Sequence, residues 1–333
     1  MILVTGSTGI VGTRLLFDLI KSGKRVRALK RHDSDTDFVK RVFHFYDSKT
    51  GGEFYEKINW CDGDITDIDS LEKAFNGIDT CYHAAALVSY DPRDEEMLIE
   101  INAEGTEKVV NVALEAGVKK ICHISSVAAL GRAEVDKLTS EYNHWNRDQN
   151  SSSYGLSKFM AEREIWRGTA EGLPAIVVNP SIILGPSKPN QSSGMLMSVL
   201  HKGIGFYPKG KAGYVDVRDV SKACIALMNS EIVNKRHLIN SENLSYNKLL
   251  NKAANIFGNK PPKYKLKPWM LTIAWIGAKV WGGLTGSRPK VTRETAKSAS
   301  SISVFDNSKI KQTLGIEFIS VEESLEYYRS FFG

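Results

Sequence analysis

The residues best suited to proton chemistry are a tyrosine and a lysine at the start of a predicted helix. Tyr154 and Lys158 are four residues apart, so both lie on one helix face. A free phenol has a pKa of about 10, which is too high for a base at neutral pH. A nearby ammonium stabilises the phenolate and lowers that pKa. The pair is therefore predicted to exchange a proton with a substrate.

A hydroxyl that binds the substrate oxygen would complete this centre. Ser126 lies just past the strand predicted over residues 120–124, and it precedes Tyr154 by 28 residues. Its neighbour Ser125 is the alternative. We predict a catalytic centre of Ser126, Tyr154 and Lys158.

A second group of residues is rich in glycine and lies between a strand predicted over 2–5 and a helix predicted over 9–22. Its glycines have the spacing GxxGxxG. The first permits a tight turn, the second lets the backbone approach a pyrophosphate, and the third allows close helix–strand packing. The helix N-terminus offers free N–H groups to phosphate. The predicted cofactor contacts are Gly6, Thr8, Gly9, Ile10, Val11 and Gly12.

The end of the second predicted strand bears on the choice between NAD and NADP. An acidic residue at this place hydrogen-bonds the ribose 2′-OH, whereas this chain has Lys30 and Arg31. Cations attract a 2′-phosphate, so we expect a preference for NADP(H). The alternative is that both cations are merely solvated. The nearby carboxylate of Asp33 supports this alternative, in which NAD(H) is the cofactor.

Two further strand ends are predicted to contact the dinucleotide. Asp64 can reach the adenine amino group, and Ile65 can pack on the ring. After the fourth strand the small side chains of Ala84, Ala85 and Ala86 let a cofactor lie against the backbone. Lys158 is then placed to hold the nicotinamide ribose.

The elements that must position these residues alternate between strand and helix. Strands are predicted over 2–5, 25–29, 57–61, 80–83, 120–124 and 175–178, and helices over 9–22, 70–76, 95–116 and 153–171. Such alternation predicts an α/β fold, a Rossmann-type doubly wound parallel sheet whose ligands bind beyond the carboxyl ends of its strands. The polar segment 33–56 has no clear assignment beyond a predicted loop over 49–52.

The second half of the chain has a different pattern. Gly, Pro and Ser cluster over 185–213, and helices are predicted over 217–228, 245–257 and 268–282. We divide the chain into a dinucleotide-binding domain, 1–180, and a smaller, mainly substrate-binding lobe, 181–333. Some later strands and helices are expected to return to the first domain.

Composition is ordinary for a soluble globular protein, with a net charge of +6 and no dominant basic cluster of the kind that binds nucleic acid. The four cysteines have no metal-ligand spacing, so we expect no metal site. A reducing compartment is the simplest assumption, and no signal peptide is evident. We expect a cytoplasmic protein.

The apolar stretch 269–284 is interrupted by Lys279 and two glycines, and it falls short of the roughly 20 apolar residues that span a bilayer. We interpret it as a helix that covers the substrate. The alternative is peripheral contact with a membrane, helped by Lys263, Lys265 and Lys267.

Taken together, the motifs resemble the extended short-chain dehydrogenase/reductases, also called the NAD-dependent epimerase/dehydratase family. The resemblance rests on TGSTGIVG at 5–12, DGDITD at 62–67, HAAA at 83–86, ISSVAALG at 124–131, YGLSK at 154–158, NPSIILGP at 179–186 and YVDVRDV at 214–220. It places the catalytic serine at Ser126. It implies nicotinamide contacts for Pro180 and Ile183, a substrate side near 214–219, and a homodimer formed through helices 95–116 and 153–171.

Within this family the residues resemble the dihydroflavonol 4-reductases and 3β-hydroxysteroid dehydrogenases. The Asp-Glu pair of nucleotide-sugar dehydratases is replaced by Val127-Ala128. The expected reaction is hydride transfer between NADP(H) and the carbonyl or secondary alcohol of a small, apolar substrate, with Tyr154 as acid or base. The alternative is an NAD-dependent nucleotide-sugar epimerase, in which Asn179 would contact a diphosphate.

Overall fold

The computed structural model describes residues 1–131, 133, 137–146, 152–189, 192–267, 269, 270, 272, 273, 275, 276, 285 and 292–332. Within these residues seven parallel strands form one sheet in the order β10-β6-β5-β4-β1-β2-β3. The strands are β1 (Ile2–Thr5), β2 (Val26–Lys30), β3 (Asn59–Asp62), β4 (Thr80–His83), β5 (Lys120–Ile124), β6 (Ala175–Pro180) and β10 (Lys235–Ile239). The predicted doubly wound parallel sheet is confirmed.

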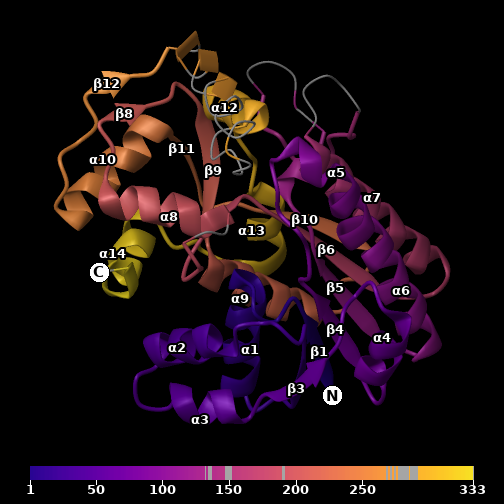
Figure 1. Cartoon of the computed structure of the whole chain (residues 1–333). Helices are drawn as coiled ribbons and strands as arrows, with labels where there is room; N and C mark the ends of the chain where they lie inside the picture. Colours follow the sequence, from indigo (N-terminus) through magenta and orange to yellow (C-terminus); the bar gives the residue numbers. More distant parts are fainter. Residues whose placement is uncertain are drawn as a thin grey trace.

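Helices cover both faces of this sheet (Figure 1). One face carries α1 (Ile10–Lys21) and α9 (Val217–Met228), and the other carries α4 (Ile68–Phe75), α6 (Gly105–Glu115) and α7 (Ser153–Ala170). The neighbours Cys81 and Tyr82 on β4 point to opposite faces and are both buried, in different hydrophobic clusters. Burial on two sides explains why β1 and β6 are mainly apolar in sequence.

The segment 33–56 forms two helices, α2 (Thr36–Tyr46) and α3 (Gly51–Glu56). The predicted loop over 49–52 is therefore wrong in its second half. A Cβ on Gly51 would lie 2.2 Å from the carbonyl oxygen of Phe43, so this glycine allows α3 to pack closely on α2. The side chain of Asp35 caps α2 by accepting from the amide of Phe38 at 2.9 Å.

The helix predicted over 95–116 is continuous but contains an insertion. It consists of α5 (Glu95–Leu98), a π-helical turn (Ile99–Glu104) and α6, and it follows a 3-10 turn (Pro92–Asp94). A π-helical turn shifts the residues after it around the helix axis, and such turns occur frequently at functional sites.

The second half of the chain builds smaller sheets and returns one strand to the large sheet. Strands β7 (Ile182–Leu184), β9 (Lys211–Asp216) and β11 (Glu242–Ser245) pair in the order β11-β9-β7, and β8 (Phe206–Tyr207) pairs with β12 (Tyr264–Lys265). The helices are α8 (Ser192–Lys202), α10 (Tyr246–Phe257), α12 (Arg293–Ser300), α13 (Ser308–Leu314) and α14 (Val321–Phe332). Strand β10 pairs with β6 in parallel.

The predicted helix 268–282 is described only in part, because residues 268, 271, 274 and 277–284 lie outside the described residues. Residues 269, 270, 272, 273, 275 and 276 are helical. Among the described residues there is no helix whose length and apolar character would suffice to cross a bilayer.

Candidate active site

The turn between β1 and α1 is pressed against the end of β4. Gly6 has a φ of +61°, and a Cβ there would lie 2.5 Å from backbone atoms of Ala84 and Ala85. A Cβ on Gly12 would lie 2.2 Å from the carbonyl oxygen of Gly6. At Gly9 the nearest such atom is 3.2 Å away, so this glycine is less crowded. The first and third glycines thus serve packing within the protein, and the second leaves room above the turn.

The N-terminus of α1 has the properties of an anion site. Its N-cap is Gly9, which provides no capping side chain, and its first turn contains no acidic residue. The first amides of a helix have no carbonyl partner within the helix, and those of Ile10, Val11 and Gly12 are in this position. The cradle therefore fits the pyrophosphate of a dinucleotide, which would receive these N–H groups and the positive end of the helix dipole.

The two cations at the end of β2 have different surroundings. Lys30 forms an ion pair with Asp62, which lies opposite it on the neighbouring strand β3. This contact lowers the pKa of the Asp62 carboxyl. Arg31 has a side chain that is 62% exposed and lies 3.6 Å from Asp33, at the long end of an ion pair. Arg31 is therefore the cation that a ligand can engage with little cost.

The residues after β3 are bound within the protein. One carboxylate oxygen of Asp64 accepts the amide and the hydroxyl of Thr66, both at 2.9 Å. Ile65 is buried in the core, where a Cβ on Gly105 would lie 2.8 Å from its Cδ1. The Ile65 side chain thus packs under α6. Beyond β4, Ala84 and Ala85 are half-buried and Ala86 is exposed.

The predicted catalytic side chains meet at the carboxyl end of β5. Tyr154 and Lys158 lie on the first turns of α7, which Ser152 caps by accepting from the amide of Gly155. The Ser126 hydroxyl accepts from the amide of Ala128 at 3.1 Å and lies near the phenol of Tyr154. The Lys158 ammonium donates to the carbonyl of Ile124 at 2.8 Å. All three residues that the sequence singled out therefore come together at one point.

Burial dominates the electrostatics of this centre. It raises the pKa of Tyr154, and the phenol of Tyr90 acts in the same direction. The side chain of Ser126 opposes this rise in the pKa of Tyr154. Burial also lowers the pKa of Lys158 to about 8, while the carboxylate of Glu162 raises it. At neutral pH the phenol is thus protonated and the ammonium is charged.

Ser125, the alternative to Ser126, points elsewhere. Its hydroxyl donates to Glu162, a fully buried carboxylate on α7. Asn179, at the end of β6, donates to the same carboxylate at 2.6 Å and to the carbonyl of Ser126 at 2.9 Å. Arg236 on β10 forms an ion pair with the other carboxylate oxygen. Glu162 therefore links the α7 helix to the loop that carries Ser126.

The sequence analysis did not identify Glu162, although its position relative to the catalytic pair could have indicated it. Tyr154, Lys158 and Glu162 recur at intervals of four on one helix, which places all three on the face toward the sheet.

A second residue that the sequence analysis did not identify is Asn102, which lies in the π-helical turn. Its amide donates to the Ser157 hydroxyl at 2.9 Å, and its oxygen accepts from the amide of Leu87 at 2.7 Å. Asn102 thus fixes the loop after β4 to the catalytic helix.

Several other predicted positions lie in the second half of the chain. Pro180 is buried and Ile183 is half-buried. Asp216 caps α9 by accepting from the amide of Arg218 at 2.8 Å, and it also accepts the Tyr328 hydroxyl at 2.7 Å. Asp219 accepts from the amide of Ile319, and burial raises its pKa to about 6.

The loop before α7 also packs on the protein. The ring of Trp145 stacks on Phe159 with centroids 4.5 Å apart. Tyr142 is exposed, with the ammonium of Lys309 5.4 Å from its ring centroid.

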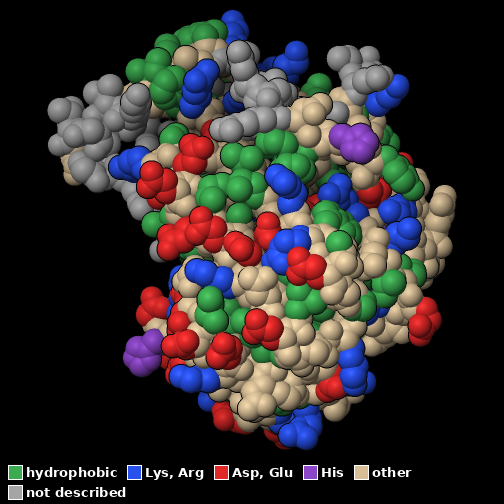
Figure 2. Space-filling view, turned by 90° about the vertical axis from the view of Figure 1, so that its right-hand side faces the viewer, with side chains coloured by type: hydrophobic (Ala, Val, Ile, Leu, Met, Phe, Trp, Pro, Cys, Tyr) green, Lys and Arg blue, Asp and Glu red, His purple; other side chains and the backbone are tan. Residues whose placement is uncertain are grey.

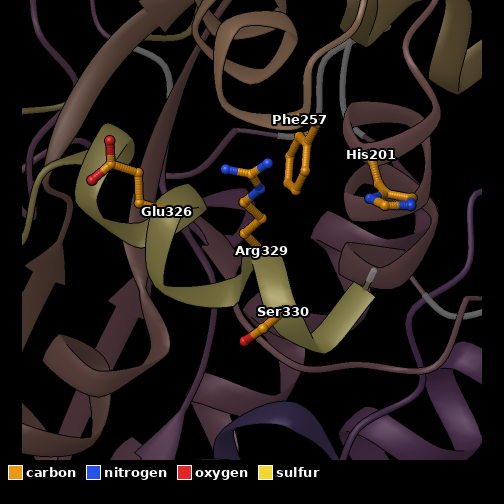
Figure 3. A pocket seen from close by; sticks show the side chains of 5 residues that line it. All are labelled: His201, Phe257, Glu326, Arg329 and Ser330. Atoms are coloured by element: carbon orange, nitrogen blue, oxygen red, sulfur yellow. The ribbon is translucent and has the colours of Figure 1, made fainter.

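A surface depression lies apart from these residues. It has a volume of about 460 Å³ and is lined by His201, Phe257, Glu326, Arg329 and Ser330, from α8, α10 and α14 (Figure 3). None of the predicted catalytic or cofactor-binding residues lines it. We therefore place the candidate site at the strand ends of the large sheet.

Comparison with known proteins agrees with this geometry. The model of the NAD dependent epimerase/dehydratase family matches residues 2–240. The chain belongs to this family. Members of the NAD dependent epimerase/dehydratase family use NAD(P), and this chain is an NAD(P)-dependent enzyme of the extended short-chain dehydrogenase/reductase type.

Curated relatives in this family include reductases. A putative dihydroflavonol 4-reductase from Synechocystis sp. is 30% identical over 329 residues, which cover 97% of this chain and 91% of that protein. Cinnamoyl-CoA reductase 1 from Arabidopsis thaliana is 27% identical over 334 residues, with 97% and 86% covered. Among solved structures, that of gox2253 is 29% identical and superimposes with a TM-score of 0.80, covering 99% of this chain and 98% of that one.

Proposed function

We propose that this enzyme is an NADP(H)-dependent reductase of a carbonyl group on a small, apolar substrate. The observation that carries the proposal is the residue type at the end of β2. At the place where an acidic residue would bind a ribose hydroxyl, the chain has an exposed arginine, Arg31. The neighbouring Lys30 is already neutralised by Asp62. An exposed guanidinium binds a 2′-phosphate with parallel hydrogen bonds, whereas it gives a ribose hydroxyl no acceptor. The reductase names of the curated relatives support the same reaction class.

The cofactor would be held along the carboxyl ends of the strands. The amides of the α1 N-terminus would receive the pyrophosphate, and Arg31 the 2′-phosphate. Lys158 donates one hydrogen of its ammonium to the carbonyl of Ile124. Its remaining hydrogens would donate to the nicotinamide ribose. When bound, this cofactor supplies the hydride for reduction or accepts it in the reverse direction.

The protein's own groups handle the proton. Ser126 would donate a hydrogen bond to the carbonyl oxygen of the substrate and hold it beside Tyr154. The buried phenol of Tyr154 is protonated at neutral pH and would give its proton to that oxygen as the carbonyl becomes an alcohol. Charged Lys158 would stabilise the resulting phenolate until water returns the proton. A phenol held in its protonated form suits reduction better than oxidation at neutral pH.

The epimerase alternative loses one of its supports. Asn179, which would contact a diphosphate in that reading, is fully buried and donates to Glu162 and to the carbonyl of Ser126. Its amide hydrogens are therefore engaged inside the protein.

The test is a titration of the purified enzyme with NADPH and NADH, after any copurified nucleotide has been released and identified. We expect NADPH to bind at least tenfold more tightly, since a charge-assisted pair with Arg31 contributes about 1.5–3 kcal/mol. The variant Arg31→Ala should remove this preference, and Arg25→Ala, an exposed arginine at the opposite end of β2, should retain it. Retained NAD with equal affinities would refute the proposal and favour an epimerase acting on nucleotide sugars.

A further inference from the structure

The cations of this chain are concentrated in one segment of the second half. Between Glu242 and Glu294 the sequence has ten Lys or Arg residues and no acidic residue. Over the whole chain the numbers are nearly balanced, with 44 basic and 38 acidic residues. The segment therefore carries a local excess of positive charge that the small net charge conceals.

Three of these cations precede the partly described helix and face the solvent. Lys263, Lys265 and Lys267 are all exposed, and the described residues provide no carboxylate within ion-pair distance of them. By contrast, Lys252 on α10 pairs with Glu322. The three lysines are thus available to an external anion.

Large apolar side chains are exposed beside these lysines. Trp269, Ile273 and Ile276 are 58%, 60% and 46% exposed, and their spacing of four and three residues places them on one helix face. On the adjoining pair of short strands, Tyr264 and Phe206 are 64% and 48% exposed, with ring centroids 5.7 Å apart. Leaving this much apolar surface in water is unfavourable, and such patches mark interaction sites.

On the face drawn in Figure 2, hydrophobic and basic side chains lie together at the upper end of the molecule.

We propose that this basic–aromatic surface, formed by Phe206, Lys263, Tyr264, Lys265, Lys267, Trp269, Ile273 and Ile276, docks on an anionic lipid bilayer. Aromatic and aliphatic side chains on one helix face enter the interface between headgroups and acyl chains, while ammonium groups pair with lipid phosphates. Positive charge without interspersed carboxylates matches a negative membrane surface. The contact is peripheral, and, if the apolar substrate proposed above is correct, it would let the enzyme take its substrate from the phase that dissolves it.

The experiment is co-sedimentation of the full-length enzyme with phosphatidylcholine vesicles that contain or lack phosphatidylserine. We expect association with the phosphatidylserine vesicles at low salt and release at high salt, because screening weakens attraction between exposed charges. The triple variant Lys263→Gln/Lys265→Gln/Lys267→Gln should partition on the order of 100-fold more weakly, from about fivefold per cation. Trp269→Ser should also weaken association, by removing an apolar anchor.

The matched control is Lys24→Gln/Lys49→Gln/Lys73→Gln, which removes the same charge from exposed lysines in the half that carries β1–β3. It should bind vesicles like the unchanged enzyme. Equal loss in both triple variants would show a mere effect of net charge and overturn the proposal. Failure of the unchanged enzyme to associate with anionic vesicles would also overturn the proposal. The exposed apolar residues would then be interpreted as part of a helix that covers the substrate.

Discussion

Replacing Glu162 with glutamine tests how the protein keeps Lys158 charged inside its core. Burial lowers the pKa of Lys158 to about 8, and Glu162 is the group that opposes this decrease. Residues four apart on a helix have side chains about 6 Å apart. At an effective dielectric constant of about 20, a unit charge at that distance contributes about 3 kcal/mol. Removing the carboxylate should therefore make the ammonium lose its proton at a lower pH.

The assay is the pH dependence of kcat/KM for carbonyl reduction. If charged Lys158 supports catalysis, the rate falls as the pH rises through about 8, where the ammonium loses its proton. In Glu162→Gln this fall should begin about one to two pH units lower, which leaves the variant slow at neutral pH. A merely structural role for the carboxylate would lower the rate at every pH without moving the profile.

A second variant separates this effect from loss of stability. In Glu162→Gln the cation of Arg236 loses its partner, and breaking a fully buried pair costs about 3–5 kcal/mol. The Arg236 side chain is 21% exposed, so the free energy of unfolding should decrease by less than that. The double variant Glu162→Gln/Arg236→Gln leaves no unpaired cation and should regain stability, as measured by urea unfolding, while keeping the shifted profile. An unshifted profile in both variants would refute the reasoning.

Three further outcomes are expected. Tyr154→Phe should reduce turnover by at least 100-fold, the contribution of a general acid, while cofactor affinity measured by fluorescence titration stays within a few-fold; a near-normal rate would contradict the assignment. Gly6→Ala should weaken cofactor binding and lower the unfolding free energy by several kcal/mol, because its Cβ would meet the backbone of Ala84 at 2.5 Å. Gly77→Ala is its control, with a φ of +72° but no atom within 4 Å of the new Cβ, so only strain of about 1 kcal/mol should be seen. Arg31→Ala should abolish the preference for NADPH, a change of at least tenfold, in the titration described above.

The large sheet could be predicted from the sequence because several of its strands, such as 2–5 and 175–178, are short, mainly apolar runs buried on both faces. In the first half of the chain the strands are followed by helices, and the apolar periodicity of a helix can be recognised from neighbouring residues alone. The segment 33–56 was not assigned, although Phe38, Val39, Val42 and Phe43 have helical spacing and form the buried face of α2. Gly51 is typical of a loop in sequence, but it lies where α3 approaches the carbonyl of Phe43 too closely for any side chain.

Within the site, what the sequence could predict was limited by distance along the chain. Tyr154, Lys158 and Glu162 share one helix, so their common face follows from spacing alone. Two partners of Glu162, Asn179 and Arg236, lie 17 and 74 residues away along the chain and reach it through the neighbouring strands β6 and β10. Such contacts also distinguish Ser125 from Ser126, which the motif alone leaves as alternatives.

The same principle changes the basis of the cofactor prediction. In the sequence Lys30 and Arg31 count equally as cations at the end of β2. In the fold, the parallel register places Asp62 opposite Lys30, and the two charges neutralise each other. A phosphate that recruited Lys30 would have to compete with this carboxylate and would be repelled by it. Discrimination between NADPH and NADH should therefore depend on Arg31 alone, and replacing Lys30 should change the preference far less than replacing its neighbour.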